Sequence, residues 1–165
     1  GELPLEIGCV ISNNSKAFIL ERARQKSIPA YHVSSKTHDN ESKAISALLE
    51  RHEIDAVVLA GYMKKISPEI LQKYSGKILN VHPALLPAFG GKGMYGGRVH
   101  EAVIASGARF SGVSVHLVDE GYDTGKILDQ RVVPVLPDDD ADTLAARVLK
   151  IEHDLYWKTL KDYLC

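Results

Sequence analysis

The sequence predicts an α/β fold in which a mostly parallel sheet carries helices on both faces and the C-terminal part is mixed. Short apolar runs alternate with helical patterns through the first half of the chain, and such alternation is typical of parallel strands joined by helices. In the second half, two extended segments follow each other across a single turn, which favours antiparallel pairing. The 165 residues, 45% of them apolar and 25% charged, suffice for one domain, 1–165.

The first half of the chain contains three predicted strands and two predicted helices. In order, they are a strand over 3–11, a helix over 17–24, a strand over 30–33, a helix over 41–52 and a strand over 55–60. Pro29 ends the first helix, because proline cannot continue the helical hydrogen bonding. Ile45, Leu48 and Leu49 form the apolar stripe of the second helix.

The second half begins with a helix that Ser67 caps and Gly76 ends, with Pro68 at its first position. The elements expected after it are a strand over 77–81, a loop with five glycines over 88–98, a helix over 99–105, strands over 113–118 and 127–134, and a C-terminal helix that begins after the acidic residues 138–142. The carboxylates favour a helix N-terminus because they interact well with its dipole.

Composition excludes several classes of function. Twenty Lys and Arg against twenty-one Asp and Glu give a net charge of −1, which lacks the positive excess of a nucleic-acid binder. No apolar run approaches a membrane span, and the two cysteines, Cys9 and Cys165, fit a reducing compartment. We therefore expect a cytoplasmic protein with neither a nucleic-acid nor a membrane partner, and leave monomer and homodimer open.

Polar residues at the carboxyl ends of strands are the first candidates for chemistry, since ligands of open α/β sheets gather there. Asn80 and His82 lie two residues apart at the end of a predicted strand, so they point to the same face. An amide donor can stabilise an oxyanion while an imidazole moves a proton, as acyl transfer requires. Alone, the pair fits equally well two strand-end groups with ordinary hydrogen bonds.

A second group of candidates follows the strand over 113–118. Asp119, Glu120 and Asp123 lie in a turn with Gly121 and Gly125. A carboxylate from this turn beside His82 would stabilise the imidazolium and raise its pKa, making the histidine a usable general acid. Aspartate and glycine are also ordinary turn residues, so the turn without a partner would indicate no function.

Other motifs give weaker indications. The run Gly90-Gly91-Lys92-Gly93 lacks the spacing of a phosphate-binding loop and is interpreted as a flexible or lid-like loop. The seven histidines show no metal-ligand spacing, so no metal is expected, although His82, His116 and Asp123 leave one open. The nucleophile elbow of serine hydrolases is absent from the sequence.

Four motifs together resemble the folate-dependent formyltransferases, and among them those that formylate glycinamide ribonucleotide in purine synthesis. They are Leu59-Ala60-Gly61-Tyr62-Met63-Lys64, Ile78-Leu79-Asn80-Val81-His82-Pro83-Ala84-Leu85-Leu86-Pro87, Ser114-Val115-His116-Leu117-Val118-Asp119-Glu120-Gly121-Tyr122-Asp123-Thr124-Gly125 and Glu152-His153. The resemblance implies a Rossmann-like formyltransferase fold and direct transfer of a formyl group from 10-formyltetrahydrofolate to the amine of glycinamide ribonucleotide, without a metal.

The same resemblance assigns roles to individual residues. Asn80 would hold the formyl oxygen, His82 would donate a proton and Asp123 would tune His82. Glu152 would face the ribonucleotide. The residues implied to line the folate pocket are Met63, Lys64, Lys65, Ile66, Asn80, Asp119, Glu120, Gly121, Tyr122 and Asp123. Lys65 replaces the apolar residue usual at its position, so the resemblance does not extend to its side chain.

The family also opens with a strand and a phosphate-binding loop that have no counterpart before Gly1, so we expect this chain to begin at the family's second strand and to bind the ribonucleotide weakly. Two relatives compete: a formyltetrahydrofolate hydrolase, and a methionyl-tRNA formyltransferase that the net charge disfavours. The remaining alternative is a catalytically silent domain that binds folate or nucleotide.

Overall fold

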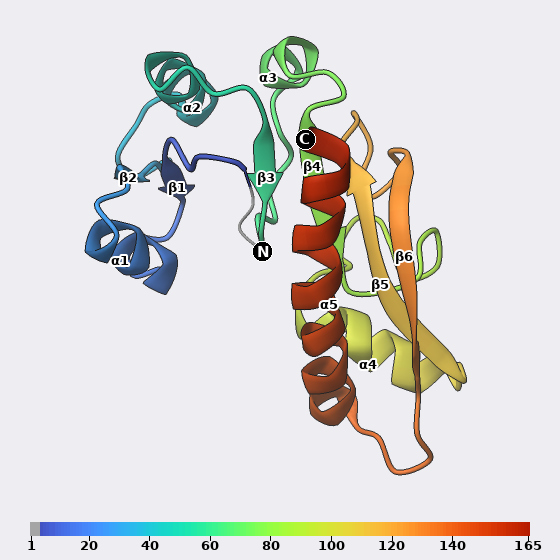
Figure 1. Ribbon diagram of the computed structural model, residues 1–165. Coiled ribbons are helices and arrows are strands. Elements are labelled where there is room, and N and C mark those ends of the chain that lie inside the picture. The colour runs from blue at the N-terminus through green and yellow to red at the C-terminus, as the bar shows by residue number, and fades with distance from the viewer. Residues whose placement is uncertain (1–3) are drawn as a thin grey trace.

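The structure is a computed structural model that describes residues 4–165 (Figure 1). Strands and helices alternate along the first part of the chain, and a pair of long strands and a long helix end it. In chain order the elements are β1 (Val10–Ser12), α1 (Phe18–Gln25), β2 (Ala30–His32), α2 (Glu41–Arg51), β3 (Val57–Leu59), α3 (Pro68–Lys73), β4 (Ile78–His82), α4 (Gly97–Ser106), β5 (Phe110–Leu117), β6 (Ile127–Pro134) and α5 (Ala141–Leu164).

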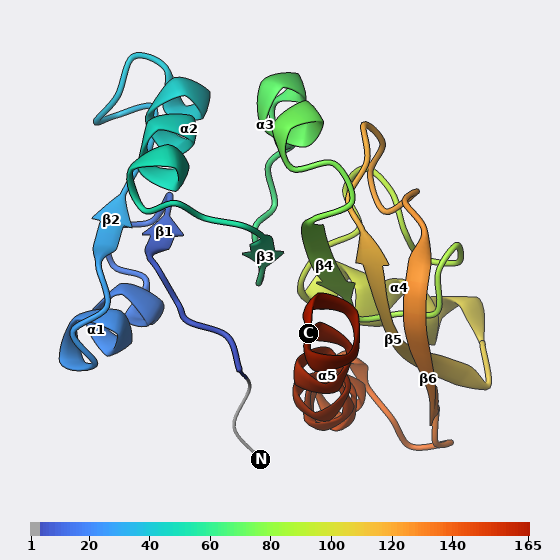
Figure 2. The same ribbon diagram turned by 45° about the horizontal axis from the view of Figure 1, so that its top comes forward.

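The strands form a parallel part and a mixed part, as the sequence predicts. β1 pairs with β2 in a two-stranded parallel sheet, and β3, β4, β5 and β6 follow in that order in a second sheet. Within the second sheet, β3 and β4 are parallel, whereas β5 runs antiparallel to both β4 and β6. Both views place β3 between the β1–β2 pair and the rest of the second sheet (Figures 1 and 2).

The first strand is shorter than predicted. The apolar run over 3–11 predicts a strand, but β1 covers only Val10–Ser12, and Gly1–Leu3 lie outside the described residues. Ile7 is 59% exposed, so the alternation of side chains there does not report burial against a core. β1 has ladder partners in β2 over three residues, and this short ladder limits the strand.

Three helices begin at a side-chain cap, of which the sequence predicts Ser67 and the acidic residues before α5. The side chain of Asn40 accepts a hydrogen bond from Lys43 N at 2.9 Å, and Ser67 accepts one from Ile70 N ahead of Pro68. Asp140 forms a reciprocal capping box with Thr143 at the start of α5. These caps fix where α2, α3 and α5 begin.

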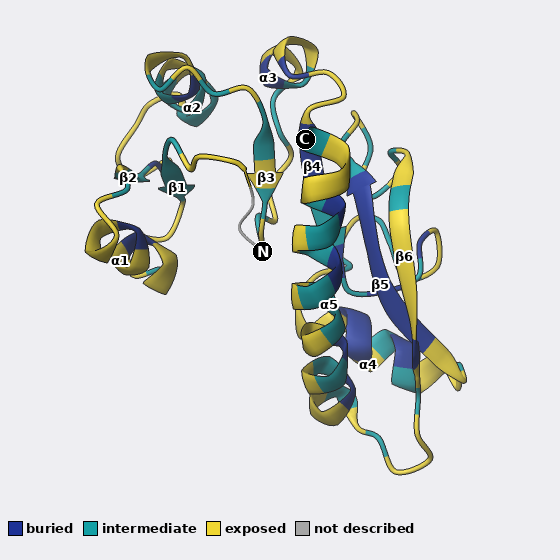
Figure 3. Cartoon of the chain, in the orientation of Figure 1, coloured by how far each residue is buried: buried dark blue, intermediate teal, exposed yellow. Residues whose placement is uncertain are grey.

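Two hydrophobic clusters hold the elements together. One joins α4, β5, β6 and α5 and includes Val103, Val113 and Val148, all fully buried. The other joins α2, α3, β3 and β4, and Ile11 of β1 packs against it, so the first sheet shares a core with the second. Burial is concentrated on β5, while the neighbouring β6 is mostly exposed (Figure 3).

None of the helices in the described residues is both long and apolar enough to cross a lipid bilayer.

Candidate active site

The end of β4 places Asn80 and His82 on one face, beside two polar residues of β5. Register pairs Asn80 with His116 and His82 with Ser114, and directly paired residues of an antiparallel ladder share a face. His82, Ser114 and His116 are all buried, whereas the apolar residues that alternate with them on β5 point to the core under α5. The strand period therefore collects the polar groups on one side.

Asn80, His82 and Asp123 meet there, as the sequence predicts, and His116 lies among them. Asn80 Nδ2 lies 3.1 Å from His116 Nε2. Asp123 reaches both histidines: its Oδ2 is 3.6 Å from His82 Nδ1 and its Oδ1 is 3.6 Å from His116 Nε2. One carboxylate thus faces two imidazoles beside one amide.

The ring of His82 is held by a backbone carbonyl. His82 Nε2 lies 2.8 Å from Phe89 O, and because a carbonyl oxygen can only accept, Nε2 carries the hydrogen. Nδ1 is then the nitrogen that can take up and release a proton beside Asp123.

Burial lowers the pKa of His82, and the carboxylate of Asp123 together with the Phe89 carbonyl opposes this shift. Asp123 raises the pKa as predicted, but desolvation outweighs it, so the net direction is downward rather than upward.

Asp123 is kept ionised by its neighbours. Burial raises the pKa of its carboxyl, but the contact with His116, the hydrogen bond from Gly91 N and the charges of the two histidines outweigh burial and place the pKa below its usual value. Gly91 N donates to Asp123 Oδ2 at 3.0 Å. Asp123 itself has a positive φ of 58°, which aspartate tolerates better than most residues.

The turn that carries Asp123 is stabilised from within. Asp119 Oδ1 accepts hydrogen bonds from Gly121 N at 2.9 Å and from Thr124 Oγ1 at 2.7 Å. Gly125 must be glycine, because a Cβ there would lie 1.8 Å from Leu117 O. Ordinary turn residues, aspartate and glycine, therefore fix the backbone that positions the carboxylate of Asp123.

Lys65 connects this turn to the loop after β3. Its Nζ donates to Glu120 O at 2.9 Å and lies 4.9 Å from the centroid of the Tyr122 ring. The two segments that the sequence assigns to a folate pocket, 63–66 and 119–123, are therefore neighbours. Met63 is 60% exposed, so its side chain is available at this edge.

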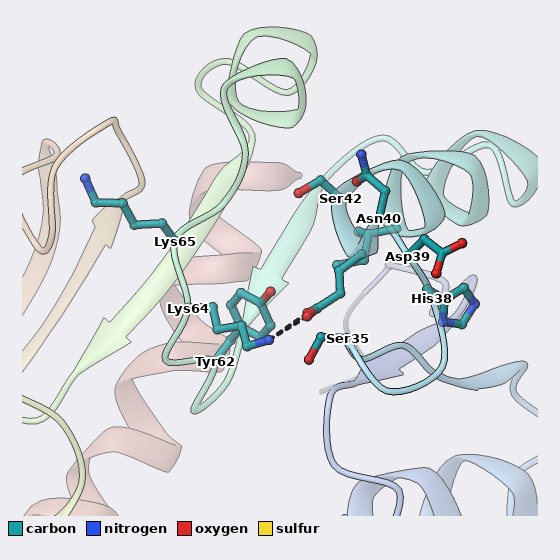
Figure 4. Close-up of a pocket in the computed structure, with 10 residues that line it drawn as sticks. Ser35, His38, Asp39, Asn40, Ser42, Tyr62, Lys64 and Lys65 are labelled. Atoms are coloured by element: carbon teal, nitrogen blue, oxygen red, sulfur yellow. Dashed lines mark hydrogen bonds and ion pairs between the residues drawn. The ribbon is translucent and has the colours of Figure 1, made fainter.

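An open pocket of about 340 Å³ lies on the other side of the loop after β3 (Figure 4). Ser35, Tyr62 and Lys64 are among its lining residues, and Lys64 forms an ion pair of 2.7 Å with Glu41 at the start of α2. Lys65 also lines the pocket but points away from that pair (Figure 4). Asn80, His82 and Asp123 do not line it, so the pocket adjoins the site rather than containing it.

Glu152 lies on α5 and is partly buried. Burial raises the pKa of its carboxyl, and the nearby His153 opposes this. Between residues 4 and 165 we find no hydrogen-bond donor for this carboxylate. Glu152 is therefore a half-buried position of α5 rather than a fully solvated one.

Sequence reasoning named His116 only as a possible metal ligand, and it missed other residues that build the site. Ser114 Oγ donates to Ala84 O at 2.7 Å and accepts from Leu86 N and Gln130 Nε2, which fixes the chain after His82. The Ser-x-His alternation on a predicted strand was the available signal for His116 and Ser114. Phe89 and Gly91 contribute backbone groups, which no side-chain pattern reveals.

Within the described part of the chain, no cluster of three or more His, Cys, Asp or Glu side chains could hold a metal ion.

The sequence matches a known protein family over most of its length. The model of the formyl transferase family matches residues 1–160. The chain belongs to the formyl transferase family. Phosphoribosylglycinamide formyltransferase, chloroplastic, of Vigna unguiculata is 50% identical over 161 residues, which are 94% of this chain and 51% of that protein. The chain thus spans about half the length of this plant relative.

Solved structures of the formyl transferase family share its fold. The crystal structure of glycinamide ribonucleotide transformylase 1 from Geobacillus kaustophilus is 38% identical with a TM-score of 0.91, covering 100% of this chain and 87% of that one. A formyltetrahydrofolate deformylase from Pseudomonas syringae pv. tomato is 28% identical with a TM-score of 0.85, covering 96% of this chain and 52% of that one. The transformylase is thus more similar in sequence than the deformylase.

Proposed function

We propose that the chain transfers a formyl group from 10-formyltetrahydrofolate to the amine of glycinamide ribonucleotide in purine synthesis. The observation that carries the proposal is the meeting of Asn80, His82 and Asp123 at the end of β4. Asp123 Oδ2 lies 3.6 Å from His82 Nδ1. Relatives named for this activity support it, and they match nearly the whole chain. Both substrates are small molecules.

The residues present can carry out direct acyl transfer. The amine nitrogen attacks the formyl carbon, and the electron pair of the C=O bond moves to oxygen, where an N–H of Asn80 stabilises the oxyanion. His82 Nδ1 then gives its proton to N10 of the folate as the C–N10 bond breaks. The neutral ring takes a proton from the new amide nitrogen, so the histidine ends in its starting state.

Asp123 stabilises the positively charged form of His82 during this cycle. Its carboxylate is ionised and lies beside Nδ1, the nitrogen that holds the transferred proton. Because burial lowers the pKa of His82, a negative charge at this position keeps the protonated form accessible.

The folate is proposed to bind along the segments 63–66 and 119–123, whose neighbouring positions leave main-chain groups available to a pterin. Lys65 joins the two segments through Glu120 O and the Tyr122 ring. The open pocket beside Lys64 gives the rest of the folate a place to extend (Figure 4). Glu152 is proposed to meet the ribonucleotide, as the resemblance to the family implies, and its side chain is half-buried on α5.

To test this proposal, we would measure the release of tetrahydrofolate from 10-formyltetrahydrofolate by the full-length gene product, with and without glycinamide ribonucleotide. We expect release that requires both the ribonucleotide and His82, so that His82→Ala abolishes it. His32→Ala is the matched control, because His32 lies in the separate β1–β2 sheet. Release without the ribonucleotide would instead support the deformylase alternative, and no release would support a silent binding domain.

A further inference from the structure

Two residues of the glycine-rich loop, Phe89 and Gly91, contact His82 and Asp123 respectively. Phe89 O accepts the hydrogen bond from His82 Nε2 at 2.8 Å, and two residues later Gly91 N donates to Asp123 Oδ2 at 3.0 Å. Both contacts come from the backbone. One short segment therefore contacts His82 at Nε2, the ring nitrogen that does not face Asp123, and contacts Asp123 at Oδ2, the oxygen that faces His82.

The local conformation of this segment fits the double contact. Phe89 has a φ of 55° and packs against the cluster under α5, which anchors the segment to the core. Gly90 has no room for a side chain, because a Cβ would lie 2.5 Å from Leu86 Cδ2 and 3.3 Å from Asp123 Cβ. Gly91 has a φ of 98°, where only glycine is unstrained.

We propose that Phe89–Gly91 is a positioning segment, which holds His82 and Asp123 in their mutual orientation and fixes the transferable proton on His82 Nδ1. The inference rests on the proposed function and deepens it. The segment does not contact the reacting atoms, so it acts through the two side chains. Gly91, in the run predicted to be flexible or lid-like, is tied to Asp123 by a hydrogen bond.

The proposal has a chemical consequence for the imidazole. With Nε2–H directed at Phe89 O, loss of the imidazolium proton can occur only from Nδ1, the nitrogen 3.6 Å from Asp123 Oδ2. If the segment moved, the neutral ring could hold its hydrogen on Nδ1 instead. That tautomer would turn a hydrogen toward the carboxylate and leave no acceptor where the leaving proton must return.

Gly90→Ala tests the positioning role, with Gly97→Ala as its control. The added methyl at Gly90 must displace the Leu86 side chain and press on the Cβ of Asp123, whereas a Cβ at Gly97 meets nothing within 4 Å. We expect Gly90→Ala to lower kcat on the order of 10²-fold with KM for both substrates nearly unchanged, because the reacting groups are misplaced rather than lost. Gly97→Ala should keep the kcat of the parent. Equal kcat values in the two variants would overturn the proposal.

A second measurement does not depend on activity or on the folding of the variant. Imidazole ¹⁵N chemical shifts of the parent protein report which nitrogen of His82 carries hydrogen above its pKa. We expect the Nε2–H tautomer, and a dominant Nδ1–H tautomer would overturn the proposal even if formyl transfer were found. Conversely, the Nε2–H tautomer in a protein without transferase activity would uphold the contact while refuting the proposed function.

Discussion

His116 is fully enclosed between Asn80 and Asp123, and its hydrogen bonds determine how Asn80 is turned. Its Nδ1 lies 2.8 Å from Leu117 O, so in the neutral ring Nδ1 carries the hydrogen and Nε2 accepts from Asn80 Nδ2. One N–H of Asn80 is thereby occupied, and the second remains for an oxyanion. His116 is therefore a positioning residue for the amide.

Two substitutions of equal polarity separate this role from simple packing. The amide of glutamine reaches the position of ring Nε2, whereas that of asparagine reaches only the position of Nδ1. We expect His116→Gln to retain most of the turnover and His116→Asn to lose on the order of 10²-fold in kcat, as removal of an oxyanion contact does. Steady-state kinetics check this, with denaturation midpoints to confirm folding. Equal kcat values would contradict the assignment.

Burial of the Glu152 carboxyl on α5 costs stability when the group is ionised. Because burial raises the pKa of its carboxyl, the ionised form is disfavoured in the folded state. A carboxyl with a raised folded pKa costs stability above that pKa and costs nothing below its unfolded pKa, near 4.3. We therefore expect Glu152→Gln to raise the melting temperature at pH 7.5 but not at pH 4. A pH-independent shift would show that packing, rather than charge, is responsible.

The side chains of the site were largely predictable, and their backbone supports were not. Asn80 and His82 follow from strand alternation, and Asp123 from a turn after the next strand. Phe89 and Gly91 act through a carbonyl and an amide, which every residue possesses, so their identity carries no such signal. The net direction of the His82 pKa also depends on burial, which a motif does not report.

At the scale of elements, one tyrosine docks α5 on the sheet beside the site. Tyr156 Oη lies 2.8 Å from Leu59 O and 3.0 Å from Leu79 O, bridging β3 and β4. Its single hydroxyl hydrogen can serve one carbonyl at a time. Burial strongly raises the pKa of this phenol, in keeping with its enclosed position.

Tyr156→Phe should therefore destabilise the fold by about 1–3 kcal/mol, because the one hydrogen that the two carbonyls share is lost in a buried place. Tyr163→Phe is the control: Tyr163 also donates to a carbonyl, Gly76 O, but it is 41% exposed, so water can replace it. We expect a loss within about 0.5 kcal/mol for the control. Urea denaturation measures both, and equal losses would contradict the role of Tyr156 as a buried bridge.

Helices and strands differ in how well the sequence predicts them. The caps at Asn40, Ser67 and Asp140 are local signals, so the helix starts agree with prediction. β6 also has the predicted bounds, 127–134. β1 and β3 are shorter than their apolar runs, because a strand extends only as far as it is hydrogen-bonded to a neighbouring strand. β1 pairs with β2, and β3 with β4, over three residues each. Apolar periodicity reports burial and not ladder length.

At the scale of the whole molecule, the fold brings distant segments to one face. β4 contributes the amide and the imidazole, the β5–β6 turn contributes the carboxylate, and the loop after β4 closes over both. The mixed topology matters here, because antiparallel β5 pairs His116 with Asn80 and leads into the turn whose Asp123 reaches His82 at the end of β4. This arrangement agrees with ligand binding at that edge of α/β sheets.

The most direct test of this account is the pH dependence of formyl transfer in the parent protein and in Asp123→Asn. If protonated His82 is the acid, kcat falls as pH rises through its pKa in the enzyme–substrate complex. Asp123 raises that pKa, so its neutralisation should lower it, moving the basic limb of the profile to lower pH and reducing turnover. An unchanged basic limb in Asp123→Asn would contradict the pairing of His82 with Asp123.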